Sequence, residues 1–172
     1  YAMRYLNERG VSYADIVKWK MGYCFDGLYR GRVVIPSFDD DGDSNYFIAR
    51  SYTKDSYKYK NPPASKDIVF NELFIDWNDD LVLVEGVFDA IRAGNAVPIL
   101  GSTLRSDSRL LRKIVFNDTP VYVALDPDAA DKERKIIETL LRYDVELYKI
   151  DRSDASVFGN VWQDEEYIYE NY

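Results

Sequence analysis

The chain contains no histidine and only one cysteine, Cys24, among its 172 residues. Without histidine, a Ser-His-Asp triad, a histidine-ligated zinc and an imidazole general base are excluded, so carboxylates, Lys, Tyr or metal-bound water must carry any acid–base chemistry. A single cysteine excludes an internal disulfide and a cysteine-rich zinc site, and it is typical of a reducing compartment. No apolar run is long enough to cross a bilayer and no signal-peptide pattern opens the chain, so we expect a soluble, cytoplasmic protein.

Positive charge is also scarce, because 22 Lys and Arg face 30 Asp and Glu and the net charge is −8. The imbalance is uneven: residues 1–70 carry 11 basic and 9 acidic side chains, whereas residues 71–172 carry 11 and 21. This division favours a protein that holds a polyanion with its front part and collects metal ions with its back part.

Two apolar runs in the acidic part end at carboxylates. Residues 81–84 are followed by Glu85, and residues 121–125 are followed by Asp126 and Asp128. Short runs of Val and Leu are typical of strands buried on both faces of a parallel sheet, whose carboxyl ends meet at one edge. Carboxylates gathered there repel one another unless a cation lies between them. Oxygen ligands of this kind favour Mg²⁺ or Mn²⁺, and the pattern therefore predicts phosphoryl-transfer chemistry on nucleotides or nucleic acid.

From residue 80 onward, strands and helices alternate at a spacing that requires right-handed crossovers and a mostly parallel sheet, which is an α/β architecture. The predicted strands are 81–84, 96–100, 121–125 and 145–150, and the predicted helices are 88–93, 106–116 and 129–142.

The front part predicts a small α+β lobe. We expect helices at 2–9 and 12–19, with Ser12 as the N-cap of the second. Strands at 32–38 and 45–52 form a hairpin around an acidic turn at 39–43, and 57–66 is an extended loop. Because the chain opens at Tyr1 rather than Met, we expect a piece of a longer protein.

The stretch 45–60 interleaves basic side chains, Arg50 and Lys58 among them, with aromatic ones. Such a surface can bind single-stranded nucleic acid by charge and by base stacking. The alternative is a solvated hairpin face whose aromatic side chains belong to the core. Gly86 and Gly101 follow strands, where they permit phosphate to approach the backbone, although ordinary turns between strand and helix would also use them.

The motifs VEGVFD, PILGST and ALDPDAADK together resemble the Toprim domain shared by DnaG-type primases, type IA and II topoisomerases and some nucleases, over roughly residues 80–155. The upstream segments YLNERGVSYADIVKWKMGYC, YRGRVVIPSFDDDGDSNYFIARSY and KYKNPPASKDIVFNEL resemble the helical entry, basic hairpin and linking loop of the DnaG-type primase catalytic core, in a bacteriophage-like version. The resemblance implies an N-terminal α+β basic lobe at 1–78, a Toprim domain at 79–155 and a tail at 156–172.

The resemblance also implies roles for individual residues. Glu85, Asp126 and Asp128 match the catalytic, metal-binding acids, and Asp89 and Asp154 match supporting metal positions. Gly101, Ser102 and Thr103 match the loop beside the site, and together with Gly86 they make up the predicted phosphate loop. Arg30, Arg32, Arg50, Lys58 and Asn61 match residues that hold template or nucleotide. The family's last acidic element is Asp-x-Asp, whereas Asp154-Ala155-Ser156 keeps one acid, which leaves the number of metal ions open.

The implied activity is DNA primase, a DNA-directed RNA polymerase that makes short RNA primers during replication. Its implied cofactor is Mg²⁺ or Mn²⁺, and its implied partners are single-stranded DNA, ribonucleoside triphosphates and a replicative helicase contacted by segments outside this sequence. Two alternatives stay open: a Toprim nuclease or topoisomerase, and a noncatalytic Toprim scaffold that binds nucleic acid. For Asp89 and Asp128, near predicted helix starts, simple helix capping is a further alternative.

Overall fold

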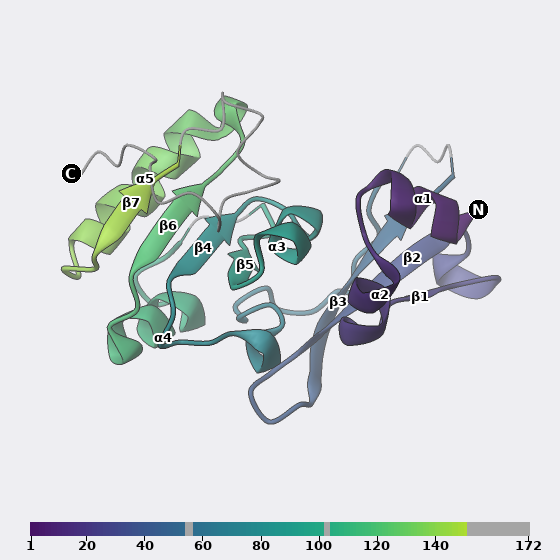
Figure 1. Ribbon diagram of the computed structural model, residues 1–172, viewed down its shortest axis with the longest axis horizontal. Coiled ribbons are helices and arrows are strands. Elements are labelled where there is room, and N and C mark those ends of the chain that lie inside the picture. Colours follow the sequence, from purple (N-terminus) through teal and green to yellow (C-terminus); the bar gives the residue numbers. More distant parts are fainter. Residues whose placement is uncertain (54–56, 102–103, 151–172) are drawn as a thin grey trace. The chain divides into compact units, whose positions relative to one another are not determined.

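The computed structural model describes residues 1–53, 57–101 and 104–150 (Figure 1). The chain divides into two compact units, Tyr1–Leu73 and Phe74–Tyr172, called here the first and second unit. The division expected at residue 78 stays a prediction, and the expected tail at 156–172 lies outside the described residues. Among the residues described, no helix is long and apolar enough to cross a lipid bilayer.

The first unit begins with two short helices, α1 (Ala2–Glu8) and α2 (Tyr13–Lys18). Ser12 caps α2: its Oγ accepts from the Asp15 backbone N–H at 3.1 Å, and the Asp15 carboxylate accepts from the Ser12 N–H at 2.8 Å. This reciprocal pairing satisfies backbone donors that a helix start leaves open. Between the helices, Gly10 has a φ of 74°, the left-handed conformation that ends many helices. Both predicted helices are confirmed.

The predicted hairpin is formed by β2 (Arg32–Phe38) and β3 (Ser44–Ser51), which pair antiparallel. Its turn is closed by the Asp39 N–H, which donates to the Asp43 carbonyl at 3.0 Å, and by the Gly42 N–H, which donates to the Asp39 carbonyl at 3.1 Å. Gly42 has a φ of 87°, which favours glycine there.

The sequence did not predict β1 (Gly22–Tyr23), a two-residue strand that pairs with Val33 and Val34 of β2. It is followed by η1 (Gly27–Tyr29), a single 3-10 turn. Because β1 is so short, it does not reach Pro36, which lacks the N–H that a neighbour on that side would need. Pro36 therefore lies where the side of β2 toward β1 is a sheet edge.

The second unit contains, within its described residues, a four-stranded parallel sheet in the order β5-β4-β6-β7. Its strands lie side by side in Figure 1. They are β4 (Leu81–Val84), β5 (Ala96–Pro98), β6 (Val121–Ala124) and β7 (Leu147–Lys149). All four predicted strands are present, and the expected α/β class with a mostly parallel sheet is confirmed.

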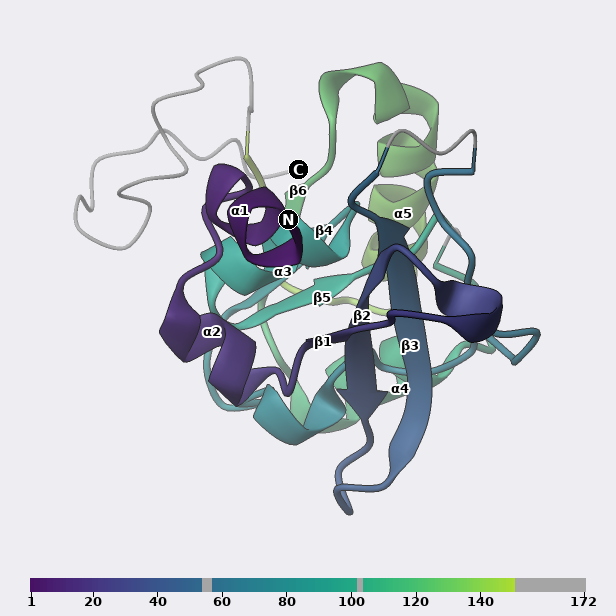
Figure 2. The same cartoon turned by 90° about the vertical axis from the view of Figure 1, so that its right-hand side faces the viewer.

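Helices cover this sheet on both faces. They are α3 (Val87–Ala93), α4 (Arg109–Asn117) and α5 (Ala130–Leu141). The chain also forms two 3-10 turns: η2 (Glu72–Phe74), at the boundary of the two units, and η3 (Pro127–Ala129), just before α5. Figure 2 shows α3 on one side of the sheet and α4 and α5 on the other. This is the arrangement that right-handed crossovers produce when β5 and β6 lie on opposite sides of β4.

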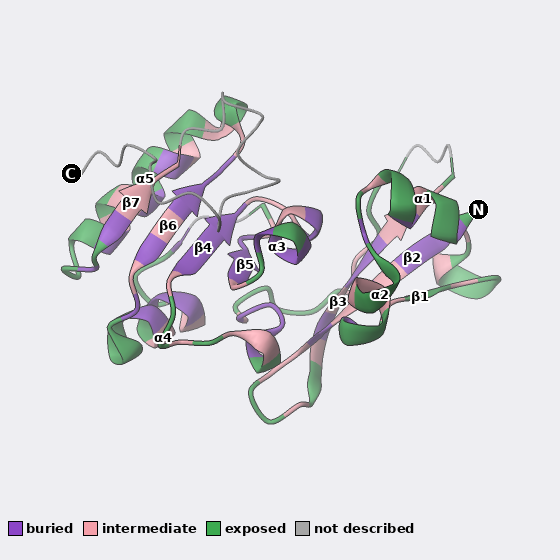
Figure 3. Ribbon diagram, in the orientation of Figure 1, coloured by how far each residue is buried: buried purple, intermediate pink, exposed green. Residues whose placement is uncertain are grey.

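Covering both faces buries the central strand. All four side chains of β4 are at most 3% exposed, and Figure 3 shows β4 buried along its length. A strand with no solvent face needs apolar residues at every position, which is why β4 reads as a continuous apolar run rather than an alternating one.

Candidate metal centre

The strand order creates a topological switch point between β4 and β6. From β4 the chain moves through α3 to β5 on one side, and it then crosses through α4 to β6 on the other side. Connections that leave in opposite directions open a crevice beyond the carboxyl ends of the two strands, and ligands of open α/β sheets bind in such crevices. The residues that follow β4 and β6 are therefore the first candidates for a site.

Those residues are the three predicted acids. Glu85 follows β4 directly, Asp126 lies two residues beyond the end of β6, and Asp128 lies in η3. Val84 pairs in register with Ala124, so the two strands end level with each other. The structure brings the three side chains together: each offers a carboxylate oxygen, and these oxygens all lie within 4.8 Å of one another.

The trio, defined as Glu85, Asp126 and Asp128, fits a divalent cation. Glu85 is half-buried and Asp128 is exposed, so the group is open to solvent on one side. Three anionic oxygens in one small region are the donor set that Mg²⁺ and Mn²⁺ prefer, and Mg²⁺ retains open positions for water and phosphate. A second group of acids, Asp39, Asp40 and Asp41 in the hairpin turn, is equally close together, so proximity of carboxylates alone does not define a metal site.

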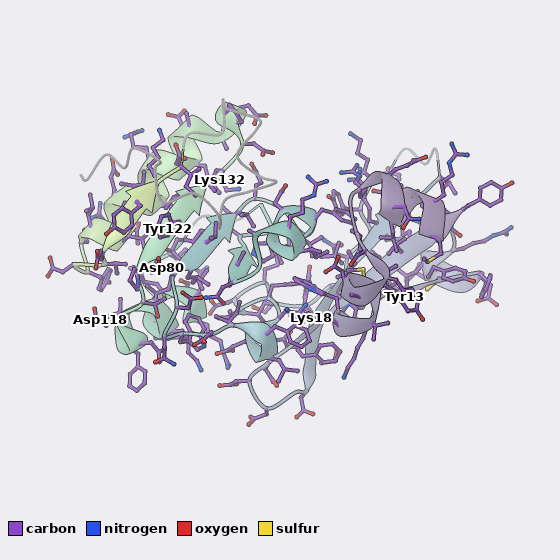
Figure 4. All side chains as sticks on the ribbon, viewed as in Figure 1. Tyr13, Lys18, Asp80, Asp118, Tyr122 and Lys132 are labelled. Atoms are coloured by element: carbon purple, nitrogen blue, oxygen red, sulfur yellow. The ribbon has the colours of Figure 1, made fainter. Side chains whose placement is uncertain are left out.

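Lys132 is a residue near the trio whose position our sequence reasoning did not identify. Its Nζ lies 3.1 Å from Glu85 Oε1, and only 17% of its side chain is exposed. Figure 4 shows Lys132 on α5, near the carboxyl ends of β4 and β6. One signal was present in the sequence: Lys132 falls in the first turn of a predicted helix, where the helix dipole disfavours a cation unless an anion accompanies it.

Asp89 lies on α3 and is outside the trio. It is the third residue of the helix, and Gly86 is the N-cap. A Cβ added at Gly86 would lie 3.3 Å from Asp89 Oδ2, so the carboxylate folds back over the helix start. That position suits helix capping as well as a supporting metal ligand, and the metal role of Asp89 stays a prediction.

The loop after β5 is described only in part. Leu100 and Gly101 have φ values of 50° and 75°, two successive left-handed residues, and glycine suits the second of them. Just before them, the Ile99 N–H donates to the Val84 carbonyl at 2.9 Å and keeps the chain beside β4. Ser102, Thr103 and Asp154, which we expected at the site, lie outside the described residues.

In the first unit, Arg50 is firmly held. Its Nε donates to the Tyr5 hydroxyl at 3.0 Å, and its guanidinium lies 4.5 Å from the centre of the Tyr59 ring. Arg50 and Tyr59 also form an antiparallel β-bridge. Within the predicted extended loop, residues 57–60 thus continue the pairing of β3.

Arg32, another predicted binding residue, is buried with 5% of its surface exposed. Its guanidinium donates to the Arg30 carbonyl at 3.2 Å and to the Tyr57 carbonyl at 3.1 Å. These contacts tie the segment after β3 to the segment before β2. Arg32 therefore has a clear structural role, and its predicted contact with template or nucleotide stays a prediction.

Lys58 and Arg30 are both exposed, as a residue that binds a polyanion must be. Asn61 is half-buried, and its Oδ1 accepts from the Ala49 N–H at 3.3 Å. Close by, burial raises the pKa of the Tyr46 hydroxyl, and the side chain of Asn61 partly opposes this effect.

Comparison with known proteins gives no match to a protein-family model and no match among curated proteins. Solved structures do match. The zinc-binding and RNA polymerase domains of the Aquifex aeolicus primase superpose with a TM-score of 0.73 at 25% identity, covering 87% of this chain and 49% of that one. A DnaG primase catalytic domain bound to single-stranded DNA gives 0.73 at 21%, covering 91% and 68%. The primase fragment of the bacteriophage T7 primase-helicase gives 0.64 at 16%, covering 85% and 63%.

These likenesses extend over both units, and the chain spans about half the length of the Aquifex aeolicus structure. The predicted resemblance to the catalytic core of DnaG-type primases is confirmed at the level of the fold, including the Toprim architecture of the second unit.

Proposed function

We propose that this chain, which has the fold of a DnaG-type primase core, makes short RNA primers on single-stranded DNA by metal-dependent nucleotidyl transfer. The observation that carries the proposal is the convergence of Glu85, Asp126 and Asp128 at the switch point, with carboxylate oxygens within 4.8 Å of one another. Fold alone does not imply function, so the acids at the ends of β4 and β6 are the decisive feature.

In this reaction a ribonucleotide 3′-hydroxyl attacks the α-phosphorus of the next triphosphate, a new P–O bond forms and pyrophosphate leaves. Asp126 and Asp128 would hold Mg²⁺ or Mn²⁺ directly, Glu85 would bind the ion or handle a proton, and Asp89 and Asp154 would support the site. When bound, the ion lowers the pKa of the attacking hydroxyl and neutralises charge on the entering and leaving oxygens. The hydroxyl proton passes to a carboxylate of the trio or to water, because the chain has no histidine to accept it.

The first unit supplies binding of the template or nucleotide. Lys58 and Arg30 are exposed and attract phosphate, and Arg50 presents a guanidinium fixed by Tyr5 and Tyr59. A guanidinium held in this way loses little conformational entropy when it binds phosphate. A replicative helicase is the further partner we expect, and we assign no described residue to it.

Incorporation of labelled ribonucleotides on a single-stranded template tests the proposal, both de novo and from a preformed RNA primer. Loss of an outer-shell metal partner typically costs ten- to a hundredfold, so we expect Asp126→Ala and Asp128→Ala each to lower incorporation at least about a hundredfold. Asp26→Ala is the matched control, because Asp26 is exposed and makes no capping hydrogen bond.

The same preparations are assayed for nicking and relaxation of supercoiled plasmid. Nicking or relaxation without incorporation would replace our proposal with a Toprim nuclease or topoisomerase. Full incorporation by either trio variant would refute the assignment of the site.

A further inference from the structure

Lys132 adds a positive charge to the trio, and this charge changes the electrostatics of the site. Three ionised carboxylates carry a charge of −3, and the ammonium of Lys132, 3.1 Å from Glu85 Oε1, reduces the local sum to −2. One divalent cation then balances the charge of these four groups. Without Lys132, one ion would leave an uncompensated negative charge.

The position of Lys132 is costly for its helix. It is the third residue of α5, whose N-cap is Ala129, and the positive end of the helix dipole disfavours a cation in the first turn. Asp131, the residue before it, has the sign that a helix start prefers. The stability of α5 therefore does not account for Lys132, whereas its contact with Glu85 does.

The geometry also couples Lys132 to the acids along the chain. Residues 126–132 form one short segment that supplies two carboxylates of the trio and then the lysine, and this lysine reaches the third carboxylate on the neighbouring strand end. The contact uses Oε1 of Glu85, and a carboxylate has a second oxygen that can bind a metal ion.

We propose that Lys132 is a positioning residue, which holds Glu85 through Oε1 and sets the affinity of the trio for a divalent ion. This inference rests on the proposed function, because it treats the trio as the metal centre. It predicts two opposite effects of removing the lysine charge. Metal binding becomes tighter because the site is more negative, and primer synthesis falls because Glu85 is no longer held.

The change in metal affinity is measured on the 172-residue chain by titration with Mn²⁺ alone. The electron paramagnetic resonance signal of the free ion monitors how much Mn²⁺ is bound. We expect Lys132→Met to bind Mn²⁺ about tenfold more tightly, from the Coulomb energy of a unit charge several ångströms from a divalent ion in a water-like dielectric. Lys132→Arg keeps the charge and should stay within about threefold of the parent chain. Lys135→Met is the matched control, since Lys135 is exposed on the same helix, and it should leave the affinity unchanged.

A double variant tests whether the effect passes through the trio. Glu85→Gln removes one negative charge and should weaken Mn²⁺ binding. Combined with Lys132→Met, it restores a local charge of −2, so the double variant should bind more weakly than Lys132→Met alone.

An unchanged or weaker Mn²⁺ affinity of Lys132→Met, with a lower thermal midpoint, would overturn the inference and leave only an ion pair that ties α5 to the end of β4. If Lys132→Met binds Mn²⁺ more tightly and Asp126→Asn abolishes binding, but the parent chain incorporates no ribonucleotide, the proposed function fails while the effect of Lys132 on metal affinity stands. If the parent chain binds no Mn²⁺, both are overturned.

Discussion

Asp128→Asn should stabilise the metal-free protein and destabilise the metal-bound one relative to the parent chain. Asp128 is exposed, and its carboxylate lies within 4.8 Å of those of Glu85 and Asp126. Two unit charges about 4 Å apart in water repel each other by about 1 kcal/mol. Part of this repulsion is offset by Lys132, so we expect a gain of about 0.5–1 kcal/mol in the free energy of unfolding. For a chain of this size, about 1 kcal/mol corresponds to about 2–4 °C in thermal midpoint.

In excess Mg²⁺ the parent chain should instead be more stable than Asp128→Asn. A ligand that binds only the folded state at about a hundred times its Kd stabilises that state by about 2.7 kcal/mol. The parent chain should gain this stabilisation, whereas Asp128→Asn offers one anionic ligand fewer and should gain much less. The two melting curves should therefore exchange places between a chelator and excess Mg²⁺.

Thermal unfolding followed by circular dichroism, with a chelator and with Mg²⁺, measures both effects. Asp26→Asn makes the same chemical change at an exposed carboxylate of the first unit, and it should shift unfolding by less than about 0.5 kcal/mol in both conditions. The reasoning is refuted if Asp128→Asn destabilises the metal-free protein, or if Mg²⁺ stabilises the variant as much as the parent chain.

Four further predictions concern other parts of the molecule. Lys58→Ala should weaken binding of single-stranded DNA, measured by fluorescence anisotropy, without affecting the stability of the fold. The slope of log binding constant against log salt concentration should become less steep by about 0.7 for each phosphate contact that is lost. Arg50→Ala should do the same and also lower the thermal midpoint, because its contacts with Tyr5 and Tyr59 are lost. Gly86→Ala places a Cβ 3.3 Å from the Asp89 carboxylate, so primer synthesis should fall while chemical denaturation shows a loss of at most about 1 kcal/mol. Because the pKa of Tyr46 is raised, its hydroxyl stays protonated to higher pH in the folded state than in the unfolded state. The free energy of unfolding should therefore fall as pH rises above about 10. Tyr46→Phe should show a smaller fall when alkaline denaturation is measured.

Much of the fold follows from local patterns. The runs at 81–84 and 121–125 predict buried strands because both faces of a covered sheet are apolar, and the structure ends these strands at Val84 and Ala124. Hydrophobic periodicity is a weaker guide to where helices begin. The predicted start of α4 at 106 lies three residues before its observed start at Arg109. The helix begins there because the Oγ of Ser108 caps it by accepting from the Leu111 N–H. The two-residue strand β1 carries no periodic signal and depends on pairing with β2.

The candidate site also has parts that the sequence predicts and parts that it does not. The meeting of Glu85 with Asp126 follows from sequence because it depends only on parallel pairing of adjacent strands. The contact of Lys132 with Glu85 and the burial of Arg32 do not, because each depends on where a long side chain points in three dimensions. A pattern of charges along the chain cannot distinguish an arginine that faces solvent from one that donates to backbone carbonyls.

The supports of the three acids differ, and this difference indicates where the site adjusts. Glu85 directly follows β4, and Asp126 lies close to the end of β6. The last residues of these two strands, Val84 and Ala124, pair in register, so the sheet fixes the backbones of Glu85 and Asp126. Asp128 belongs to η3, a single 3-10 turn that leads into α5. A short turn changes conformation at lower cost than a paired strand. When an ion binds, Asp128 should therefore move to complete its coordination, while Glu85 and Asp126 supply the fixed part of the site.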